Sequence, residues 1–384
     1  MADTSRLTRR DRILGALLGV HAGDALGATV EFETWESIQI THPHGVRDIV
    51  GGGHFGWPAG HATDDTDLTR AVLLAYRDAE QARRSQSSSS SSPSVDIVQL
   101  AAQYMVDWYD GRNWPGRVPG QIPRDVGGAT GVGIRRFKQT GDLRTSGAGQ
   151  GRAGNGSLMR CIPTALFQPD PGLADTESIA ISAITHDDVH CTLACAAYNA
   201  VVRALIEGKT QGEAWQAGRD AVQRAAASCE ATATAGGVGM DKITAAARKV
   251  EAAFDAGKEL VQVADLAARG PKAATNGAKA LPNKASGYVL ESLTIALAAL
   301  LDPRPLEEVL VDVVRVGRDT DTNAAIAGGL LGARDGVEGI PLRWREKLQF
   351  AEEFEEVVEF MLDGSGTGMP AEMPTADEGG PKGG

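Results

Sequence analysis

The stretch at residues 19–28 reads GVHAGDALGA, and it belongs to a segment in which glycine recurs at every fourth position. The glycines of this row are Gly15, Gly19, Gly23 and Gly27. Large apolar residues between positions 13 and 18 mark the buried face of a helix covering roughly residues 9–28. Glycine costs a helix roughly 1 kcal/mol relative to alanine, so a row along one side indicates a packing reason. We therefore expect a second helix to approach this one closely.

Two acidic clusters lie far apart along the chain and resemble each other. Residues 63–67 read TDDTD, and residues 318–323 read RDTDTN. A single cluster of this kind is most simply a helix N-cap, because threonine and aspartate are common there. Three aspartates within four positions exceed what a cap needs, since like charges repel unless a cation lies between them. Carboxylate and hydroxyl oxygens are ligands of Mg²⁺ and Mn²⁺, so the pair of clusters favours one site for two metal ions.

Bulk composition excludes several classes of partner. The chain has 384 residues and a formal net charge of −12, which argues against nucleic acid or an anionic membrane as the main partner. The N-terminus is polar and basic, and no stretch of roughly 18 apolar residues is evident. The four cysteines lack zinc-ribbon spacing and do not suggest a secreted disulfide framework. We expect a cytoplasmic protein, most simply a monomer.

Helical periodicity dominates the chain, and few segments alternate with period two, which predicts a nearly all-α fold. We expect one domain over residues 1–362, with a low-complexity serine loop at 85–94 and a peripheral insertion at 210–285. The tail at 363–384 is predicted to be disordered. Besides a helix capped by Ser94, the expected helices cover residues 9–28, 65–82, 134–140, 156–166, 175–186, 189–207, 287–301, 305–316, 320–334 and 343–362.

Glycine-rich loops are candidates for holding a phosphate-bearing ligand. Residues 149–154 match G-x-G-x-x-G, but the preceding residues are polar and small, so a dinucleotide-binding strand is rejected. Backbone N–H groups at the following helix start could instead take a diphosphate. Gly127 opens another helix and could form a second wall, and Tyr288 could stack on a base or lie in the core. A soft metal site of His186, His190, Cys191 and Cys195 is rejected, because the intervening residues indicate ordinary helix packing.

Six short motifs in order give the chain a resemblance to the ADP-ribosylglycohydrolase family, over most of residues 10–335. They are residues 19–32 with Glu31, Thr63 to Thr66, Gly154 to Arg160, Thr185-His186, Ser286 to Val289, and Asp319 to Thr322. Each motif is weak alone, and their shared order carries the resemblance.

The resemblance implies a fold, a cofactor and a reaction. The fold is a compact, multi-helix orthogonal bundle around a dinuclear centre, with two Mg²⁺ or, in some members, Mn²⁺. The reaction is hydrolysis at C1″ of ADP-ribose, which releases ADP-ribose from modified arginine or serine side chains of a protein. The implied metal ligands are Thr63, Asp64, Asp65, Asp319, Asp321 and Thr322. Catalysis is assigned to Glu31 and Asp65, and ligand contact to Gly127, Asn155, Gly156, Ser157, Met159, His186 and Tyr288.

Some features depart from the family pattern. Arg318 stands where the family often has glycine, Asp67 adds a carboxylate to the first cluster, and the 210–285 region fits poorly. Two other functions stay open at this point. One is an inactive relative that binds ADP-ribose or has a structural role, and the other is a metallohydrolase of a guanidine or nucleotide substrate. The complete set of oxygen-bearing residues at the expected metal positions favours the enzyme.

Overall fold

The computed structural model describes residues 7–85, 95–233, 238–260, 262–270 and 285–363. Within these residues the chain is helical, with only two isolated β-bridges and no β-strand. The helices are α1 (Arg9–Gly27), α2 (Trp35–Thr41), α3 (Asp64–Ser85), α4 (Ile97–Asp110), α5 (Gly128–Thr140), η2 (Leu158–Arg160), α6 (Ile162–Phe167), α7 (Pro171–Ala183), α8 (Val189–Ile206), α9 (Gln211–Ala233), α10 (Met240–Glu259), α11 (Val263–Arg269), α13 (Val289–Leu301), α14 (Leu306–Arg315), α15 (Thr320–Asp335), η3 (Val337–Gly339), α16 (Leu342–Arg345) and α17 (Ala351–Leu362). The prediction of an all-α fold is confirmed.

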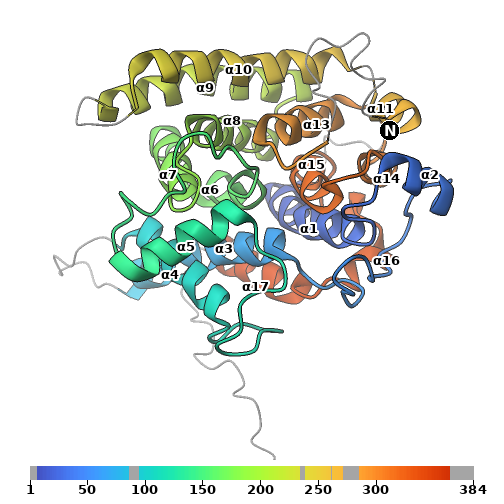
Figure 1. Cartoon of the computed structure of the whole chain (residues 1–384), viewed down its shortest axis with the longest axis horizontal. Helices are drawn as coiled ribbons and strands as arrows, with labels where there is room; N and C mark the ends of the chain where they lie inside the picture. Colours follow the sequence, from blue (N-terminus) through green and yellow to red (C-terminus); the bar gives the residue numbers. More distant parts are fainter. Residues whose placement is uncertain (1–6, 86–94, 234–237, 261, 271–284, 364–384) are drawn as a thin grey trace, which may run out of the picture.

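The glycine row of α1 packs against α15 at the centre of the fold (Figure 1). A Cβ atom on Gly19 would lie 2.1 Å from the carbonyl oxygen of Gly328, and one on Gly23 would lie 2.0 Å from that of Ala324. No larger residue fits at these positions without moving a helix backbone. The expectation of a close helix contact is confirmed, and its consequence is that the C-terminal turns of α1 lie directly beside the first turn of α15.

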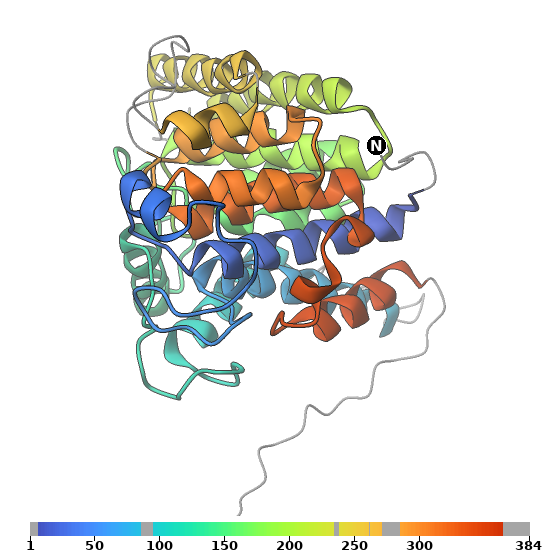
Figure 2. The ribbon, with the colours of Figure 1, turned by 90° about the vertical axis from the view of Figure 1, so that its right-hand side faces the viewer.

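The remaining helices surround this central pair in layers (Figure 2). On one side, α8 and α13 pack against α15, and α9 and α10 form an outer layer upon α8 and α13. On the other side, α3 and α17 pack against α1. The expected insertion at 210–285 therefore contains the outer helices α9 and α10 together with α11, while residues 271–284 lie outside the described residues.

Several expected helix boundaries were wrong. The helix expected at 134–140 begins at Gly128, the one expected at 156–166 is divided into η2 and α6, and the one expected at 343–362 is divided into α16 and α17. Ser94 and most of the serine loop lie outside the described residues, and the cap of α4 is Asp96, whose carboxylate accepts from the N–H groups of Val98 and Gln99. The short helix α2 was not predicted. The expected tail lies outside the described residues from 364 onward.

The expectation that no stretch is long and apolar enough to span a bilayer is wrong for one helix. Val189–Ile206 passes that test by length and composition, with a mean hydropathy of 1.4 over 18 residues. In the structure, 83% of this window is buried among other helices. Its apolar character therefore matches its place in the protein core.

Candidate metal centre

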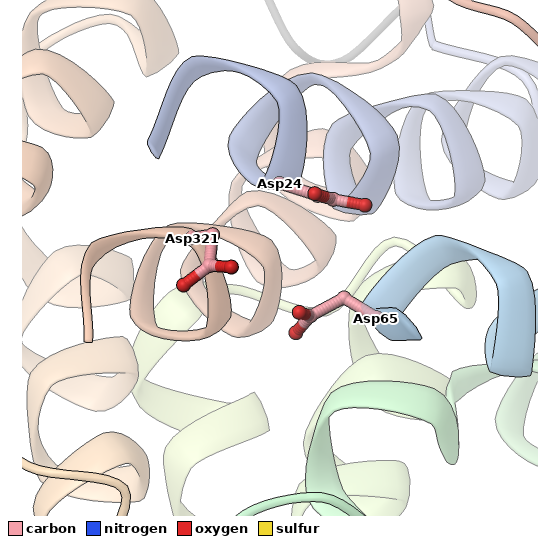
Figure 3. Close-up of side chains that lie close together, drawn as sticks. All are labelled: Asp24, Asp65 and Asp321. Carbon is pink, nitrogen blue, oxygen red and sulfur yellow. The ribbon is translucent and has the colours of Figure 1, made fainter. Parts of the chain in front are cut away.

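Three buried aspartates from three different helices converge at the contact between α1, α3 and α15 (Figure 3). They are Asp24 on α1, Asp65 in the first turn of α3 and Asp321 in the first turn of α15. One carboxylate oxygen of each lies within 4.8 Å of the others. The close contact of the glycine row produces this arrangement, because a Cβ on Gly27 would lie 2.5 Å from the Cα of Asp321.

Asp24 fastens the start of α3 to α1. Its Oδ2 accepts from the N–H groups of Thr63 and Thr66, at 3.1 and 3.2 Å, and from the Thr66 hydroxyl at 2.5 Å. These groups are donors that a helix N-terminus otherwise leaves unsatisfied. A carboxylate from another helix thus acts in place of an N-cap, which leaves Asp64 and Asp65 of α3 free to face the centre.

Several oxygens of this centre are buried without any hydrogen-bond partner. They are Asp24 Oδ1, Asp65 Oδ1, Asp321 Oδ1 and Glu31 Oε2. The other oxygen of Asp65, Oδ2, accepts from the hydroxyls of Thr63 at 3.1 Å and Thr322 at 3.5 Å. Buried polar atoms in native proteins almost always have a partner, so four orphaned acceptors in one place point to a positively charged ligand that attracts oxygen. A hard divalent cation fits that description, and these donors suit it.

Burial and mutual repulsion oppose ionisation of these carboxyl groups. Burial raises the pKa of Asp24 to about 7 and that of Asp64 to about 6. Burial, followed by the charges of Asp319, Asp64 and Asp24, raises the pKa of Glu31 to about 8. The pKa values of Asp65 and Asp321 are also raised, again chiefly by burial. A bound cation would stabilise the ionised forms and reverse these shifts.

A cavity of about 560 Å³ opens beside the centre. A second group of carboxylates faces it, since oxygens of Glu31, Asp125 and Asp321 lie within 4.8 Å of one another. The lining residues are Glu31, Phe32, Asp64, Asp125, Val126, Gly127, Gly128, Ala129, Thr130, Gly154, Asn155, Gly156, Met159, His186, Ser286, Gly287, Arg318, Asp319, Asp321 and Thr322. This volume lies within the range of small-molecule and cofactor sites.

Backbone and side-chain donors hold the outer aspartates in place. The N–H of Gly127, just before α5, donates to Asp64 Oδ2 at 3.2 Å. The Asn155 amide donates to Asp319 Oδ2 at 2.7 Å and to the Ser292 hydroxyl at 2.9 Å. Gly127 and Asn155 were both predicted to contact the ligand. In the structure they line the cavity and also orient carboxylates that face it.

His186 lies in the cavity wall as a neutral ring. Burial, followed by the charge of Arg160, lowers its pKa to about 3. Arg160 donates to the Thr185 hydroxyl at 2.8 Å, and that hydroxyl lies 2.7 Å from His186 Nδ1. Because the hydroxyl accepts from Arg160, its own proton is available for Nδ1, and this favours the tautomer that carries a proton on Nε2. His186 is therefore suited to donating a hydrogen bond rather than to acid–base catalysis.

Ser157, Tyr288 and Asp67 lie outside the cavity and outside the carboxylate centre, whereas Thr63 and Asp65 belong to the centre without lining the cavity. Ser157 is buried behind the wall, where its hydroxyl accepts from Ser182 at 2.9 Å. Tyr288 pairs through its backbone with Gly154, and its ring lies near that of His190 rather than in the cavity lining. Asp67 points away from the centre, and its carboxylate accepts from the indole N–H groups of Trp108 and Trp114, each at 2.8 Å.

Asp24 and Asp125 were missed as site residues. A signal for Asp24 was present, because it is a charged residue within an otherwise apolar, glycine-lined helix. Asp125 lies in the long segment between α4 and α5, where neither helical periodicity nor a motif marks it. Its position opposite Glu31 follows from how this segment packs on α3, and no local pattern indicates that.

A helical fold over the described residues, with an oxygen-only carboxylate centre beside a ligand-sized cavity, is typical of the class of metal-dependent enzymes. A family model described as ADP-ribosylglycohydrolase matches residues 5–369. The chain belongs to the ADP-ribosylglycohydrolase family, whose members hydrolyse the glycosidic bond to ADP-ribose. It is accordingly a glycosidic-bond hydrolase of this metal-dependent family, and its acidic cluster is able to bind metal ions.

Individual relatives agree with this membership. The chain is 28% identical to the ADP-ribosyl-[dinitrogen reductase] glycohydrolase of Rhodospirillum rubrum, over 90% of this chain and 92% of the relative. It is 26% identical to the ADP-ribosylarginine hydrolase Tri1 of Pseudomonas putida (strain GB-1), over 92% of this chain and 78% of the relative. A solved structure described as an ADP-ribosylglycohydrolase-related protein complex superposes with a TM-score of 0.65 at 24% identity, covering 92% of this chain and 97% of that one. This last likeness concerns the fold.

Proposed function

We propose that the chain removes ADP-ribose from ADP-ribosylated arginine side chains of proteins, using two Mg²⁺ ions, with Mn²⁺ as the alternative metal. The observation that carries the proposal is the set of orphaned carboxylate oxygens on Asp24, Asp65, Asp321 and Glu31. Two groups of three carboxylates meet at Asp321, which supports two adjacent cations rather than one. The proposed ligands remain Thr63, Asp64, Asp65, Asp319, Asp321 and Thr322.

The acidic cavity supports the arginine linkage over the serine linkage. An ADP-ribosylated arginine presents a cationic guanidinium beside the scissile bond, and carboxylates pair with guanidinium in well-defined geometry. Glu31 and Asp125 face the same side of the cavity as Asp321 and could accept such a group. A serine-linked substrate brings no positive charge and gains nothing from them. The name of one relative, the ADP-ribosylarginine hydrolase Tri1, points in the same direction.

The protein residues have separate tasks in the proposed reaction. The bond between C1″ and the guanidine nitrogen breaks, the nitrogen keeps the electron pair, and the oxygen of water bonds to C1″. Glu31 accepts a proton from that water in its ionised form, which a bound cation would favour by offsetting the burial that raises the pKa of Glu31 to about 8. When bound, the divalent cations would supply positive charge that anchors ribose hydroxyls and polarises water. His186 and Asn155, which also line the cavity, would position the sugar.

The working form that we propose is a cytoplasmic monomer without nucleic acid or membrane as partner. The net charge of −12 supports the exclusion of polyanions, because an acidic protein is repelled by them.

Release of ADP-ribose from matched peptides tests the proposal. Arginine-linked and serine-linked ADP-ribosyl peptides are incubated with the protein in Mg²⁺, in Mn²⁺ and in chelator, with Asp65→Ala as the inactive control. We expect release from the arginine-linked peptide with either metal and none in chelator. Release only from the serine-linked peptide would overturn the linkage. Binding of ADP-ribose without any release would instead favour the inactive, ADP-ribose-binding alternative.

A further inference from the structure

Arg318 occupies an unusual backbone conformation at the edge of the cavity. Its φ is +71°, in the left-handed region that non-glycine residues rarely adopt. Two hydrogen bonds hold it there: its N–H donates to the Glu33 carbonyl, and its carbonyl accepts from the Phe32 N–H, both at 2.8 Å. Phe32 is itself left-handed, with φ of +67°. Glycine adopts this left-handed conformation without strain, whereas arginine does not. Backbone conformation therefore does not account for the arginine, and its side chain must have a role of its own.

The guanidinium of Arg318 has no partner within the described residues. No side-chain hydrogen bond or ion pair involves it, although five carboxylates line the same cavity. They are Glu31, Asp64, Asp125, Asp319 and Asp321. Arg318 is exposed, whereas Asp321 just beyond it is buried. Arg318 therefore presents an exposed cation that pairs with none of these acids at the edge of the cavity.

Phe32 places an apolar ring at the same edge. It lines the cavity and its side chain is 52% exposed. The ring packs edge-on against His54 and Phe55, with centroid separations of 5.2 and 6.0 Å. These aromatic contacts, together with the backbone hydrogen bond between Phe32 and Arg318, hold this edge of the cavity in place. We call Phe32, His54, Phe55 and Arg318 the outer rim.

The outer rim faces the protein part of a substrate. The ribose must reach the carboxylate centre at the bottom of the cavity for the bond at C1″ to be cleaved. The polypeptide that carries the modified side chain therefore passes the rim. The rim offers it a free cation beside exposed aromatic surface, and that combination attracts a carboxylate and repels a second basic side chain.

We propose that Arg318 is a specificity-determining residue, which selects ADP-ribosylated sites that carry an acidic side chain next to the modified residue. The inference rests on the proposed function and names a substrate class for the same site. Asp319 follows Arg318 in the chain, but within the described residues the Arg318 side chain makes no hydrogen bond or ion pair with any proposed metal ligand, so we expect its effect to fall on which peptide is chosen rather than on the chemical step.

Competing peptides test the selection. Two ADP-ribosyl peptides are identical except that one has glutamate and the other lysine on both sides of the modified residue. The value of kcat/KM is measured for each peptide, with the arginine or serine linkage that the wild-type protein cleaves. We expect the wild type to prefer the glutamate peptide by about three- to five-fold, the size that a solvent-exposed ion pair gives. The preference should weaken as salt is added, because exposed charges are screened.

Four variants separate charge from backbone strain. Arg318→Lys should keep the preference for the glutamate peptide. Arg318→Gln should bring the ratio of kcat/KM for the glutamate peptide to that for the lysine peptide close to one, and Arg318→Glu should invert this ratio. All three keep a side chain at the same left-handed position, so strain is matched among them. Arg248→Gln, on the exposed side of the outer helix α10, removes an equal charge far from the cavity and should behave as wild type.

The outcomes distinguish this inference from the proposed function. If the wild type is active and the ratio of kcat/KM between the two peptides is unchanged in Arg318→Gln and Arg318→Glu, the proposed selection by Arg318 is overturned and the proposed function is not. An equal loss on both peptides, together with weaker binding of free ADP-ribose, would show that Arg318 binds the diphosphate, and it also overturns the proposal. Failure of the wild type to release ADP-ribose from any peptide contradicts the proposed function itself.

Discussion

The amide of Asn155 donates to Asp319 Oδ2 at 2.7 Å, across 164 residues of sequence. This bond joins the central glycine-rich motif to the second acidic cluster. It turns one oxygen of Asp319, a residue that lines the cavity, toward Asn155. The same amide donates to Ser292 on α13, so three segments meet at one side chain.

Replacement of Asn155 should weaken metal binding. Partners that orient a ligand carboxylate typically contribute about 10–100-fold in metal affinity or activity. We expect Asn155→Ala to raise the Mg²⁺ dissociation constant by roughly that factor, as measured by titration calorimetry. Asn155→Asp should be worse, because it adds a carboxylate beside Asp319. Ser292→Ala is the matched control, since it removes only the other partner. Equal affinities in all four proteins would contradict this role.

Asp65→Ala and Asp321→Ala should each abolish turnover while the protein stays folded. Both carboxylates are buried among like charges, and burial and these charges raise their pKa values. Removing one of them relieves repulsion, so the metal-free variants should melt at or above the wild-type temperature near pH 8. Addition of Mg²⁺ should raise the melting temperature of the wild type much more than that of either variant. Asp142→Ala removes a half-buried carboxylate beyond α5 that pairs with Arg144, outside the centre, and serves as the control. Near-normal activity in either centre variant would refute the metal assignment.

Asp67→Asn should destabilise the fold by about 1–3 kcal/mol, the usual cost of a buried donor left unpaired. The carboxylate of Asp67 accepts from two indole N–H groups, whereas an asparagine offers one acceptor and turns its NH₂ toward the second indole. Urea unfolding measures the loss. Trp114→Phe removes one donor, so the double variant with Asp67→Asn should be less destabilised than the sum of the two single changes. Strict additivity would show that the two side chains are not coupled.

Acid should destabilise the protein through His21. This ring is buried, its Nε2 lies 3.2 Å from the Gly60 carbonyl, and burial lowers its pKa to about 3. The unfolded chain takes up a proton below about pH 6.5, whereas the folded chain does not until about pH 3. Stability from this group is therefore complete above pH 6.5 and is lost as the pH falls, by up to about 1.4 kcal/mol per pH unit.

His21→Gln isolates this contribution, since it removes the titrating group and keeps a donor for Gly60. The slope of unfolding free energy against pH, measured in Mg²⁺ between pH 6.5 and 4.5, should be shallower than in the wild type. Parallel slopes would mean that His21 is protonated in the folded state.

Gly19→Ala should disrupt the central helix pair. The added methyl would lie 2.1 Å from the Gly328 carbonyl oxygen, so the helices must separate. Overpacking of this kind costs about 1–3 kcal/mol or more, and separation would also move Asp24 away from Asp321. We expect lower stability and weaker metal binding together. Gly212→Ala, on α9 with nothing within 4 Å of the new atom, should not destabilise the protein. Normal metal affinity in Gly19→Ala would show that the centre tolerates movement of α1.

The sequence by itself determined the all-α fold class and the position of the two acidic clusters, although several helix boundaries were wrong. The informative patterns are local, because each depends only on residues that are neighbours in the sequence. They are the apolar period and glycine row of α1, the two acidic clusters and the 154–160 motif. The sequence predicted correctly that the two clusters come together, because two sets of repelling carboxylates indicate a shared cation.

Only the tertiary structure decided which acidic side chains meet and which do not. Asp24 and Asp125 joined the site, Asp67 turned toward two indoles, and Ser157 and Tyr288 lay outside the cavity. The physical reason is that burial, repulsion and hydrogen bonding at the centre depend on contacts between segments far apart in sequence. Those contacts depend on how closely α1 and α15 can approach each other. The glycines of α1 indicate that some helix packs closely against it, but they do not specify that this helix is α15.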